Sequence, residues 1–356
     1  MRQLRSITIH DVAERARVSV GTVSRVLNAH PEVSAVLRHK VEKAIAELRY
    51  RPNIRAQSLS RRSSPIISFI LSNRAFIHPF HSRVLQGVEE YCEQSGYFVL
   101  FAKFDYSRDT EPSALRLPRL LQSHGLADCI IVAGTNYGNF LQVLDDLRLK
   151  YVTLGNNLVD CADRPPLNQV RFDDKAGAIE AVCYLIQLGH RDIWFIGDIS
   201  TPWSRSRHEG YLRAMQSAGL EPKAMTVGLS TDQSLDGFRS AEFILENALP
   251  VTAIFCGTDS IAYGAWDALA AHGAHVPADI SLIGFDDVFG THRTPELTSV
   301  QVPAETVGRE LARMAIARIQ TGEDVRSVVL PTHLQRRESC RPILQGREVA
   351  AHRAGV

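Results

Sequence analysis

Hydrophobic residues recur at helical spacing in three short segments of the first fifty residues. The first helix is predicted to begin at Thr8, an N-cap candidate with Asp11 three residues on, the second at Ser19 and the third at Ser34. The positions these helices would bury are Val12, Ala13 and Ala16, then Val23, Val26 and Leu27, then Leu37, Val41, Ala44, Ile45 and Leu48. A tight turn separates the first helix from the second, predicted over residues 20–28, so the segment fits a helix-turn-helix.

From Ile66 the pattern changes to short apolar runs that alternate with amphipathic stretches. Residues 84–92 carry apolar side chains at helical spacing, and the runs predicted as strands are residues 66–71, 97–101, 129–133, 151–154, 193–196, 253–256 and 280–285. Strands that alternate with helices indicate parallel sheets with helices on both faces. Because the rhythm begins again near residue 193, we predict two similar subdomains, with a ligand-binding cleft at the carboxyl ends of their strands.

The composition is typical of a soluble globular protein with two or three domains. The chain has 356 residues, of which 45% are hydrophobic and 22% are charged. It contains no run of eighteen apolar residues, and the N-terminus lacks the apolar core of a signal peptide. We therefore expect a cytoplasmic protein without a membrane segment.

Cysteine and histidine patterns give no support for a metal site. The six cysteines are scattered, with no CxxC pair and no Cys/His cluster, so buried free thiols are predicted. His78 and His81 are three residues apart, but no further ligand joins them at useful spacing. His190 is expected in a helix-to-strand connection, as a capping residue and not a catalytic one.

Charge is distributed unevenly along the chain. Residues 1–62 hold thirteen Lys or Arg and five acidic residues, an excess of eight positive charges, although the whole chain has a net charge of only +1. The remainder therefore carries an excess of seven negative charges. A basic head on an acidic body is typical of a nucleic-acid-binding module attached to another domain, although a solvated basic surface would give the same charge.

The basic head resembles the headpiece of the LacI/GalR family of bacterial repressors. The resemblance rests on residues 7–13, on the segment VSVGTVSRVLN over residues 18–28, and on residues 50–59, which begin with Tyr50-Arg51-Pro52-Asn53. It implies that Val20, Gly21 and Arg25 face base edges in the major groove. Thr22, Ser24 and Asn28 would touch phosphates, and Leu59 would wedge into the minor groove at the operator centre. The other DNA-contacting residues that we predict are Thr8, Ser19, Asn53 and Arg55.

These DNA-binding roles differ in how well the side chains suit them. Arg25 is the best candidate for bidentate recognition of a guanine. Val20 offers only an apolar contact and Gly21 only its backbone, so both residues could simply permit a close approach. Leu59 has an alternative as a packing leucine of the linker.

The acidic body resembles the effector domain of the same family, which is similar to periplasmic binding proteins. Matching segments are residues 78–80, 173–178, 188–193, 259–265 and 283–287, and the whole resemblance covers about residues 6 to 340. It implies an N-terminal all-α helix-turn-helix headpiece at residues 6–51 and a hinge helix and linker at 52–64. An α/β periplasmic-binding-protein-like effector domain of two interleaved parallel-sheet subdomains would follow at 65–345, with a tail at 346–356. The tail region lacks apolar heptads, so a tetramer through a terminal coiled coil is not expected.

The resemblance also implies a set of effector-binding residues. The cleft would be lined by Phe80, His81 and Thr135, with Trp203 stacking on a sugar ring or packing in its loop. The polar groups would be Asp173, Arg207, Asp259 and Asp286. Arg207 and Asp286 are the strongest of these, because a guanidinium and a carboxylate suit vicinal hydroxyls or a ligand carboxylate. Each polar residue has an alternative as a solvated strand end or a buried structural ion pair.

Two other classes of protein share parts of this pattern. An enzyme is disfavoured, because the sequence contains no G-x-G-x-x-G after a strand, no phosphate-binding P-loop, no H-E-x-x-H and no G-x-S-x-G. A secreted solute-binding protein is disfavoured by the basic head and the missing signal peptide. We therefore predict a dimeric, allosteric transcriptional regulator, a repressor by the family's usual outcome, that binds a palindromic operator. Its effector would be a sugar or sugar derivative, with a nucleobase or sugar acid as the alternatives, and it would need no cofactor.

Overall fold

The computed structural model describes most of the chain, in two units. The described residues are 7–27, 30, 32–51, 64–74, 79–123, 125–161, 167–226, 232–288 and 293–343. Contacts between Cα atoms divide the chain after Pro65. The predicted hinge and linker, residues 52–64, and the tail, 346–356, lie almost entirely outside the described residues. Within those residues, no helix has the length and apolar character needed to cross a membrane.

The N-terminal unit contains helices α1 (Ile9–Ala16), α2 (Val20–Leu27) and α3 (Ala35–Leu48). The N-terminus of α1 is fixed by Thr8, whose backbone N–H and hydroxyl each donate to Oδ2 of Asp11 at 2.7 Å. Ser19 Oγ accepts from the backbone N–H of Thr22 at 3.1 Å and so caps α2. The three predicted helix starts are confirmed, because Ser34 Oγ accepts from the N–H of Leu37 at 3.4 Å.

A small apolar core joins these three helices. Its fully buried members are Val12, Ala13, Ala16, Val23, Val26, Val41 and Ala44, with Leu27, Ile45 and Leu48 packed at its edge. Leu37 was predicted to join this core and does not, since it is 36% exposed. It lies in the first turn of α3, one turn before Val41, the first residue of that helix that the core buries.

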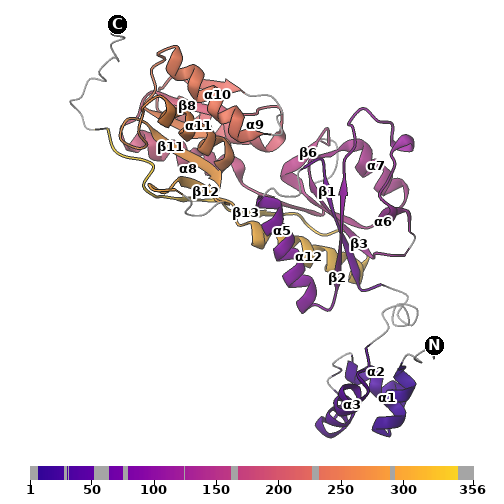
Figure 1. The fold of residues 1–356 in the computed structure, drawn as a ribbon. Coiled ribbons are helices and arrows are strands. Elements are labelled where there is room, and N and C mark those ends of the chain that lie inside the picture. The colour runs from indigo at the N-terminus through magenta and orange to yellow at the C-terminus, as the bar shows by residue number, and fades with distance from the viewer. Residues whose placement is uncertain are drawn as a thin grey trace, which may run out of the picture. The chain divides into compact units, whose positions relative to one another are not determined.

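The first sheet of the C-terminal unit has the order β13-β7-β5-β3-β1-β2, and all its pairs are parallel. Its strands are β1 (Ile66–Ser72), β2 (Phe98–Phe104), β3 (Cys129–Gly134), β5 (Tyr151–Leu154), β7 (Gln169–Phe172) and β13 (Val328–Leu330). Helices α5 (Pro79–Gln94) and α12 (Ala304–Thr321) cover one face, and α6 (Arg119–Gln122) and α7 (Gly138–Asp146) pack on the other (Figure 1). Helices α5 and α12 cross closely, because a Cβ on Gly87 would overlap the carbonyl of Glu305.

The second sheet has the order β14-β12-β11-β10-β8-β9. Its strands are β8 (Ile193–Gly197), β9 (Lys223–Thr226), β10 (Ala253–Cys256), β11 (Ser281–Asp286), β12 (Thr298–Gln301) and β14 (His333–Gln335). Helices α8 (Asp174–Gln187) and α9 (Pro202–Ser217) pack on one face, and α10 (Gln233–Glu246) and α11 (Asp259–Ala271) on the other. The expectation of wholly parallel sheets is wrong at one edge, where β14 pairs antiparallel with β12. A short parallel pair, β4 (Asn136–Tyr137) with β6 (Leu158–Val159), completes the sheets.

The polypeptide passes between the two subdomains three times. It leaves the first sheet between β7 and α8, returns between β12 and α12, and crosses again between β13 and β14. Each subdomain is therefore built from segments that are distant in sequence, and the connections β7–α8 and β12–α12 run beside the carboxyl ends of strands. The expected fold class, a helix-turn-helix headpiece with two parallel-sheet subdomains, is confirmed apart from the antiparallel edge.

The burial of the cysteines and the contacts of His190 point to structural roles. None of the six cysteines forms a disulfide, but only Cys92, Cys129 and Cys256 are buried, and the other three are half-buried. His190 lies between α8 and β8, where its Nδ1 lies 3.1 Å from Thr252 Oγ1 and its Nε2 lies 3.1 Å from the carbonyl of Arg341. Burial lowers the pKa of His190 to about 4, so the ring is neutral at pH 7. Its backbone N–H caps α8 through the carbonyl of Leu185, as expected.

Candidate functional site

A pocket lies between the two subdomains of the C-terminal unit, where strands from both sheets end. It has an empty volume of about 360 Å³, including the part open to solvent. Residues from both subdomains line it: Arg74, Phe80, His81, Asn157 and Phe172 from the first, and Trp203, Arg207, Gln233, Thr258 and Asp286 from the second. Open α/β sheets bind ligands beyond the carboxyl ends of their strands, and this pocket has that position in both sheets.

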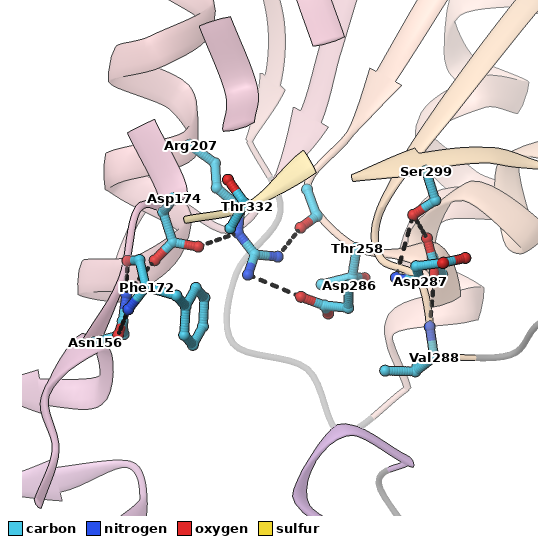
Figure 2. A network of polar contacts seen from close by, with 12 residues as sticks. Asn156, Phe172, Asp174, Arg207, Thr258, Asp286, Asp287, Val288, Ser299 and Thr332 are labelled. Atoms are coloured by element: carbon cyan, nitrogen blue, oxygen red, sulfur yellow. Dashed lines mark hydrogen bonds and ion pairs between the residues drawn. The ribbon is translucent and has the colours of Figure 1, made fainter. Parts of the chain in front are cut away.

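Arg207 is the centre of the polar network at this pocket. It is only 2% exposed, and it reaches from α9 between two carboxylates (Figure 2). Its Nε donates to Oδ1 of Asp174 at 2.7 Å, and its Nη2 lies 2.8 Å from Oδ1 of Asp286. Its Nη1 donates to the carbonyl of Gly257 at 2.6 Å. The two carboxylates raise the pKa of Arg207, so the guanidinium stays charged despite its burial.

Aromatic rings hold the same guanidinium in a fixed plane. The Cζ atom of Arg207 lies 3.6 Å from the ring centroid of Phe285 and 4.6 Å from that of Trp203. Such contacts are favourable because the ring faces are electronegative. The guanidinium is therefore positioned by two acids, one carbonyl and two rings before any ligand arrives.

Asp286 occupies a strained backbone position at the end of β11. Its φ is 103° and that of Asp287 is 52°, in a region that non-glycine residues rarely adopt. Such strain costs on the order of 1–3 kcal/mol per residue and is commonly found at functional sites. Burial raises the pKa of Asp286, and the adjacent Arg207 guanidinium opposes that shift. The strained turn presents the Asp286 carboxylate to the pocket.

Asp174 is fixed from its other side by Asn156. Asn156 Nδ2 donates to Oδ2 of Asp174 at 2.7 Å and to the carbonyl of Phe172 at 2.8 Å. Its Oδ1 accepts from the backbone N–H of Phe172 at 3.0 Å. The chain crossing from β7 to α8 is thus tied to the arginine network (Figure 2).

Helix α2 in the N-terminal unit offers a second candidate surface. Gly21 and Arg25 are exposed, and Val20, Thr22 and Ser24 are half-buried. A Cβ built on Gly21 would meet only Ser19 Oγ, at 3.7 Å, so packing within the headpiece does not require a glycine here. Among the described residues, no hydrogen bond or ion pair engages the side chain of Arg25. Helix α2 thus exposes its backbone at Gly21 and the guanidinium of Arg25, which suits a negatively charged partner outside the protein.

Comparisons with known proteins find relatives of both units of the chain. A model of the bacterial regulatory proteins of the lacI family matches residues 8–53, and a model of the periplasmic binding protein-like domain matches residues 182–340. The chain is 32% identical over 346 residues to the HTH-type transcriptional regulator CelR of Thermobifida fusca, covering 95% of this chain and 100% of that protein. It is 29% identical over 323 residues to the HTH-type transcriptional repressor CytR of Escherichia coli, covering 90% of this chain and 92% of that protein.

The chain belongs to the LacI family. It is therefore a DNA-binding transcriptional regulator with a ligand-binding effector domain, and not an enzyme. Among solved structures, the lac repressor dimer bound to operator and the anti-inducer ONPF superposes with a TM-score of 0.76 at 26% identity, covering 95% of this chain and 100% of that one. A complex of the transcriptional regulator CelR with cellobiose gives a TM-score of 0.67 at 28% identity, covering 94% of this chain and 99% of that one.

Five of the residues expected in the effector cleft of this LacI-family chain do line the pocket: Phe80, His81, Trp203, Arg207 and Asp286. Trp203 was predicted to lie in a loop, but it lies in the first turn of α9. It is 7% exposed and lies close to two guanidinium groups, those of Arg207 and Arg74. Its ring therefore already has cationic partners.

Three residues expected in the cleft do not line the pocket. Asp173 is the N-cap of α8, and its Oδ1 accepts from the N–H of Ala176 at 2.9 Å. Thr135 contacts Arg74, and its Oγ1 accepts a hydrogen bond from Arg74 Nε at 3.1 Å. Asp259 is 3% exposed, and its carboxylate faces Ser299 Oγ at 2.5 Å and the N–H of Val288 at 3.1 Å. Each of these side chains has a structural partner instead of a place at the pocket wall.

Sequence reasoning missed the other pocket residues. Arg74, Phe172 and Thr258 share one signal, because each stands at or just after the end of a strand. Gln233 and Asn157 carry no comparable signal. In the headpiece, the predicted DNA-contacting residues Asn28, Asn53, Arg55 and Leu59 lie outside the described residues. Val20 packs against the headpiece core, which leaves less of its side chain for DNA than expected.

Proposed function

We propose that this chain is a repressor that binds a palindromic operator as a dimer and is controlled by a small polar ligand in the pocket between the two effector subdomains. The observation that carries the proposal is the pairing of two features in one chain. Helix α2 has an exposed, unengaged Arg25, and the pocket has a preorganised Arg207–Asp286 pair. Arg25 suits the recognition of DNA bases. The Arg207–Asp286 pair suits the binding of a ligand with hydroxyl groups.

At the operator, Arg25 contacts a guanine and the exposed backbone at Gly21 lies close to the DNA. Thr22 and Ser24 contact phosphates, and Ser19 and Thr8 contribute from the two helix N-termini. Asn28, Asn53 and Arg55 add contacts, and Leu59 enters the minor groove. A dimer matches the two-fold symmetry of a palindromic site, and the similar lac repressor, whose structure is a dimer bound to operator, supports this arrangement. Such a protein acts on chromosomal DNA in the cytoplasm.

In the pocket, a sugar or sugar derivative is the proposed ligand. CelR, one of the similar structures, is described as a complex with cellobiose. Phe80, His81 and Trp203 provide the wall, and Asp286 accepts hydrogen bonds from ligand hydroxyls. Because residues of both subdomains line the pocket, a ligand that contacts both favours one closure state over the other. That difference in affinity between closure states is what would couple ligand binding to operator binding.

The DNA half of the proposal is tested by selecting genomic fragments with the purified full-length protein at fixed salt, since phosphate contacts are sensitive to salt. We expect one inverted repeat, whose binding weakens when Leu59 is replaced by Ala. Arg25→Gln should weaken binding by about 10- to 100-fold, the loss typical of one bidentate base contact. Lys43→Gln, which removes the same charge from an exposed position on α3, is the matched control and should change the affinity less than threefold.

Two results would contradict this proposal. Recovery of bulk DNA without a common sequence would mean that the headpiece is not a specific reader. Equal losses for Arg25→Gln and Lys43→Gln would mean that only the total positive charge of the headpiece matters.

A further inference from the structure

The pocket contains two arginines with opposite electrostatic surroundings. Arg207 contacts two carboxylates and one carbonyl. Arg74 follows β1 in the first subdomain, and among the described residues its side chain has one hydrogen-bond partner: its Nε donates to Oγ1 of Thr135 at 3.1 Å. No carboxylate oxygen of the described residues lies within 4.0 Å of its nitrogens.

The guanidinium of Arg74 is nevertheless firmly placed. Thr135, its partner, is itself anchored, because its backbone N–H donates to the carbonyl of Ser72 at 2.9 Å and its carbonyl accepts from Asn73 Nδ2 at 3.1 Å. On another side, the Cζ atom of Arg74 lies 5.7 Å from the ring centroid of Trp203. The Nη1 and Nη2 groups remain without a partner among the described residues, at the wall of the pocket.

Burial lowers the pKa of Arg74, whereas that of Arg207 is raised. The carboxylates of Asp198 and Asp286 act on Arg74 from too far away to offset the burial. A partly buried cation without a contacting anion is costly, and a ligand that supplies the anion removes the cost. Arg207, by contrast, already has its counterions, so it does not need a ligand anion.

We propose that the ligand of this pocket carries an anionic group, a carboxylate or a phosphate, which binds Nη1 and Nη2 of Arg74. This deepens the proposed function, on which it rests, by naming the class of effector: a sugar acid or a sugar phosphate, not a neutral sugar. A guanidinium binds either anion through two parallel N–H···O bonds. Asp286 meets the hydroxyl groups of the same ligand from the second subdomain, so that the ligand spans the two subdomains.

The test measures ligand binding to the full-length protein by calorimetry and by tryptophan fluorescence, at constant ionic strength because exposed cations also attract anions. The probes are inorganic phosphate, glucuronate, glucose 6-phosphate and glucose. The variants are Arg74→Gln and Arg74→Lys, and Arg213→Gln is the control. Arg213 is an exposed arginine on α9, the helix that carries Arg207 and Trp203.

We expect inorganic phosphate to bind the wild type saturably and at least one of the two anionic sugars to bind more tightly than glucose. Which of the two binds more tightly distinguishes a sugar acid from a sugar phosphate. Affinity for the anions should fall at least tenfold in Arg74→Gln, recover in part in Arg74→Lys, and stay unchanged in Arg213→Gln. The Arg74→Lys variant keeps the charge and so keeps the test valid if the glutamine variant unfolds.

The proposal is overturned if phosphate and both anionic sugars fail to saturate, or if they bind Arg74→Gln within twofold of the wild type. Glucose binding as tight as that of both anionic sugars would also overturn it, while leaving a neutral-sugar regulator in place. Failure of the proposed function gives a different result, since it appears in the selection of DNA fragments, which is done without any of these probes.

Discussion

Helix α2 of the headpiece and the pocket of the effector domain differ in what their polar side chains contact. On α2, Gly21 and Arg25 are exposed, and no described residue engages the Arg25 side chain. In the pocket, Arg207 is 2% exposed and donates to two carboxylates and a carbonyl. An exposed polar group without a protein partner is hydrated, at little cost in free energy. A buried polar group must be paired within the protein. The two binding surfaces should therefore respond to substitution in opposite ways.

The largest effect should follow from removing the buried guanidinium. Arg207→Ala leaves Asp174 and Asp286 buried beside each other without their shared cation. Breaking a buried ion pair in this way typically costs about 3–5 kcal/mol of the free energy of unfolding. Urea unfolding monitored by tryptophan fluorescence measures this loss in the effector domain, since all three tryptophans, Trp194, Trp203 and Trp266, belong to it.

Arg213→Ala on the same helix is the control and should stay within about 0.5 kcal/mol of the wild type, as surface substitutions do. Arg207→Ala should also lose the response to ligand, provided that the variant is assayed well below its unfolding midpoint. A loss of stability below about 1 kcal/mol would show that the carboxylates do not depend on Arg207, and the comparison between the two surfaces would fail.

The fold could be predicted from the sequence wherever a strand is a buried apolar run. Residues 66–71, 129–133 and 253–256 are strands in the structure, because strands buried on both faces are predominantly apolar. The strands β12 and β14 were missed, since Thr298–Gln301 and His333–Gln335 are short and largely polar. Their places are set by contacts with segments distant in the sequence, which no local pattern records.

The pocket could be predicted only in part, for a similar reason. The sequence pointed to Asp173, but the adjacent Asp174 is the residue that contacts Arg207. Both stand at the start of one helix, and which of them caps it and which turns inward depends on where the helix begins, to within one residue. Arg74 was missed because an arginine after a strand is more often solvated than buried.

A smaller effect should distinguish Asp259 from Asp174 and Asp286, the two acids paired with Arg207. Burial and the nearby Asp286 raise the pKa of Asp259 from its ordinary value of 3.8 to about 8, so the folded protein holds a proton there that the unfolded chain has lost. Stability therefore falls as pH rises between these two values and levels off above about 8. Between pH 7 and 9 this loss amounts to about 1.4 kcal/mol.

Asp259→Asn should abolish that loss, because an amide does not titrate. Its oxygen can accept from the N–H of Val288, and its Nδ2 can donate to Ser299 Oγ, whose hydroxyl donates to Asp259 in the wild type. Urea unfolding at pH 7 and pH 9 should show the variant gaining about 1.4 kcal/mol on the wild type, with other titrating groups cancelling in the difference. A difference that does not change with pH would mean that the folded protein holds no such proton on Asp259.

The smallest effect, and one of opposite sign, is expected on α2. Gly21→Ala should stabilise this helix by about 0.5–1 kcal/mol, since alanine is the better helix former and the added Cβ meets only Ser19 Oγ. Slower amide hydrogen exchange in α2 of the full-length protein would report the gain. Operator affinity should nevertheless fall, because the new methyl group occupies the place where DNA would approach the backbone.

The same change in α11, Gly264→Ala, is the contrast: there a Cβ overlaps the carbonyl of Ser234, so stability should drop. If Gly21→Ala left operator affinity unchanged, the bare backbone of α2 would not lie against DNA, and only the side chain of Arg25 would remain as evidence that this helix is the reading surface.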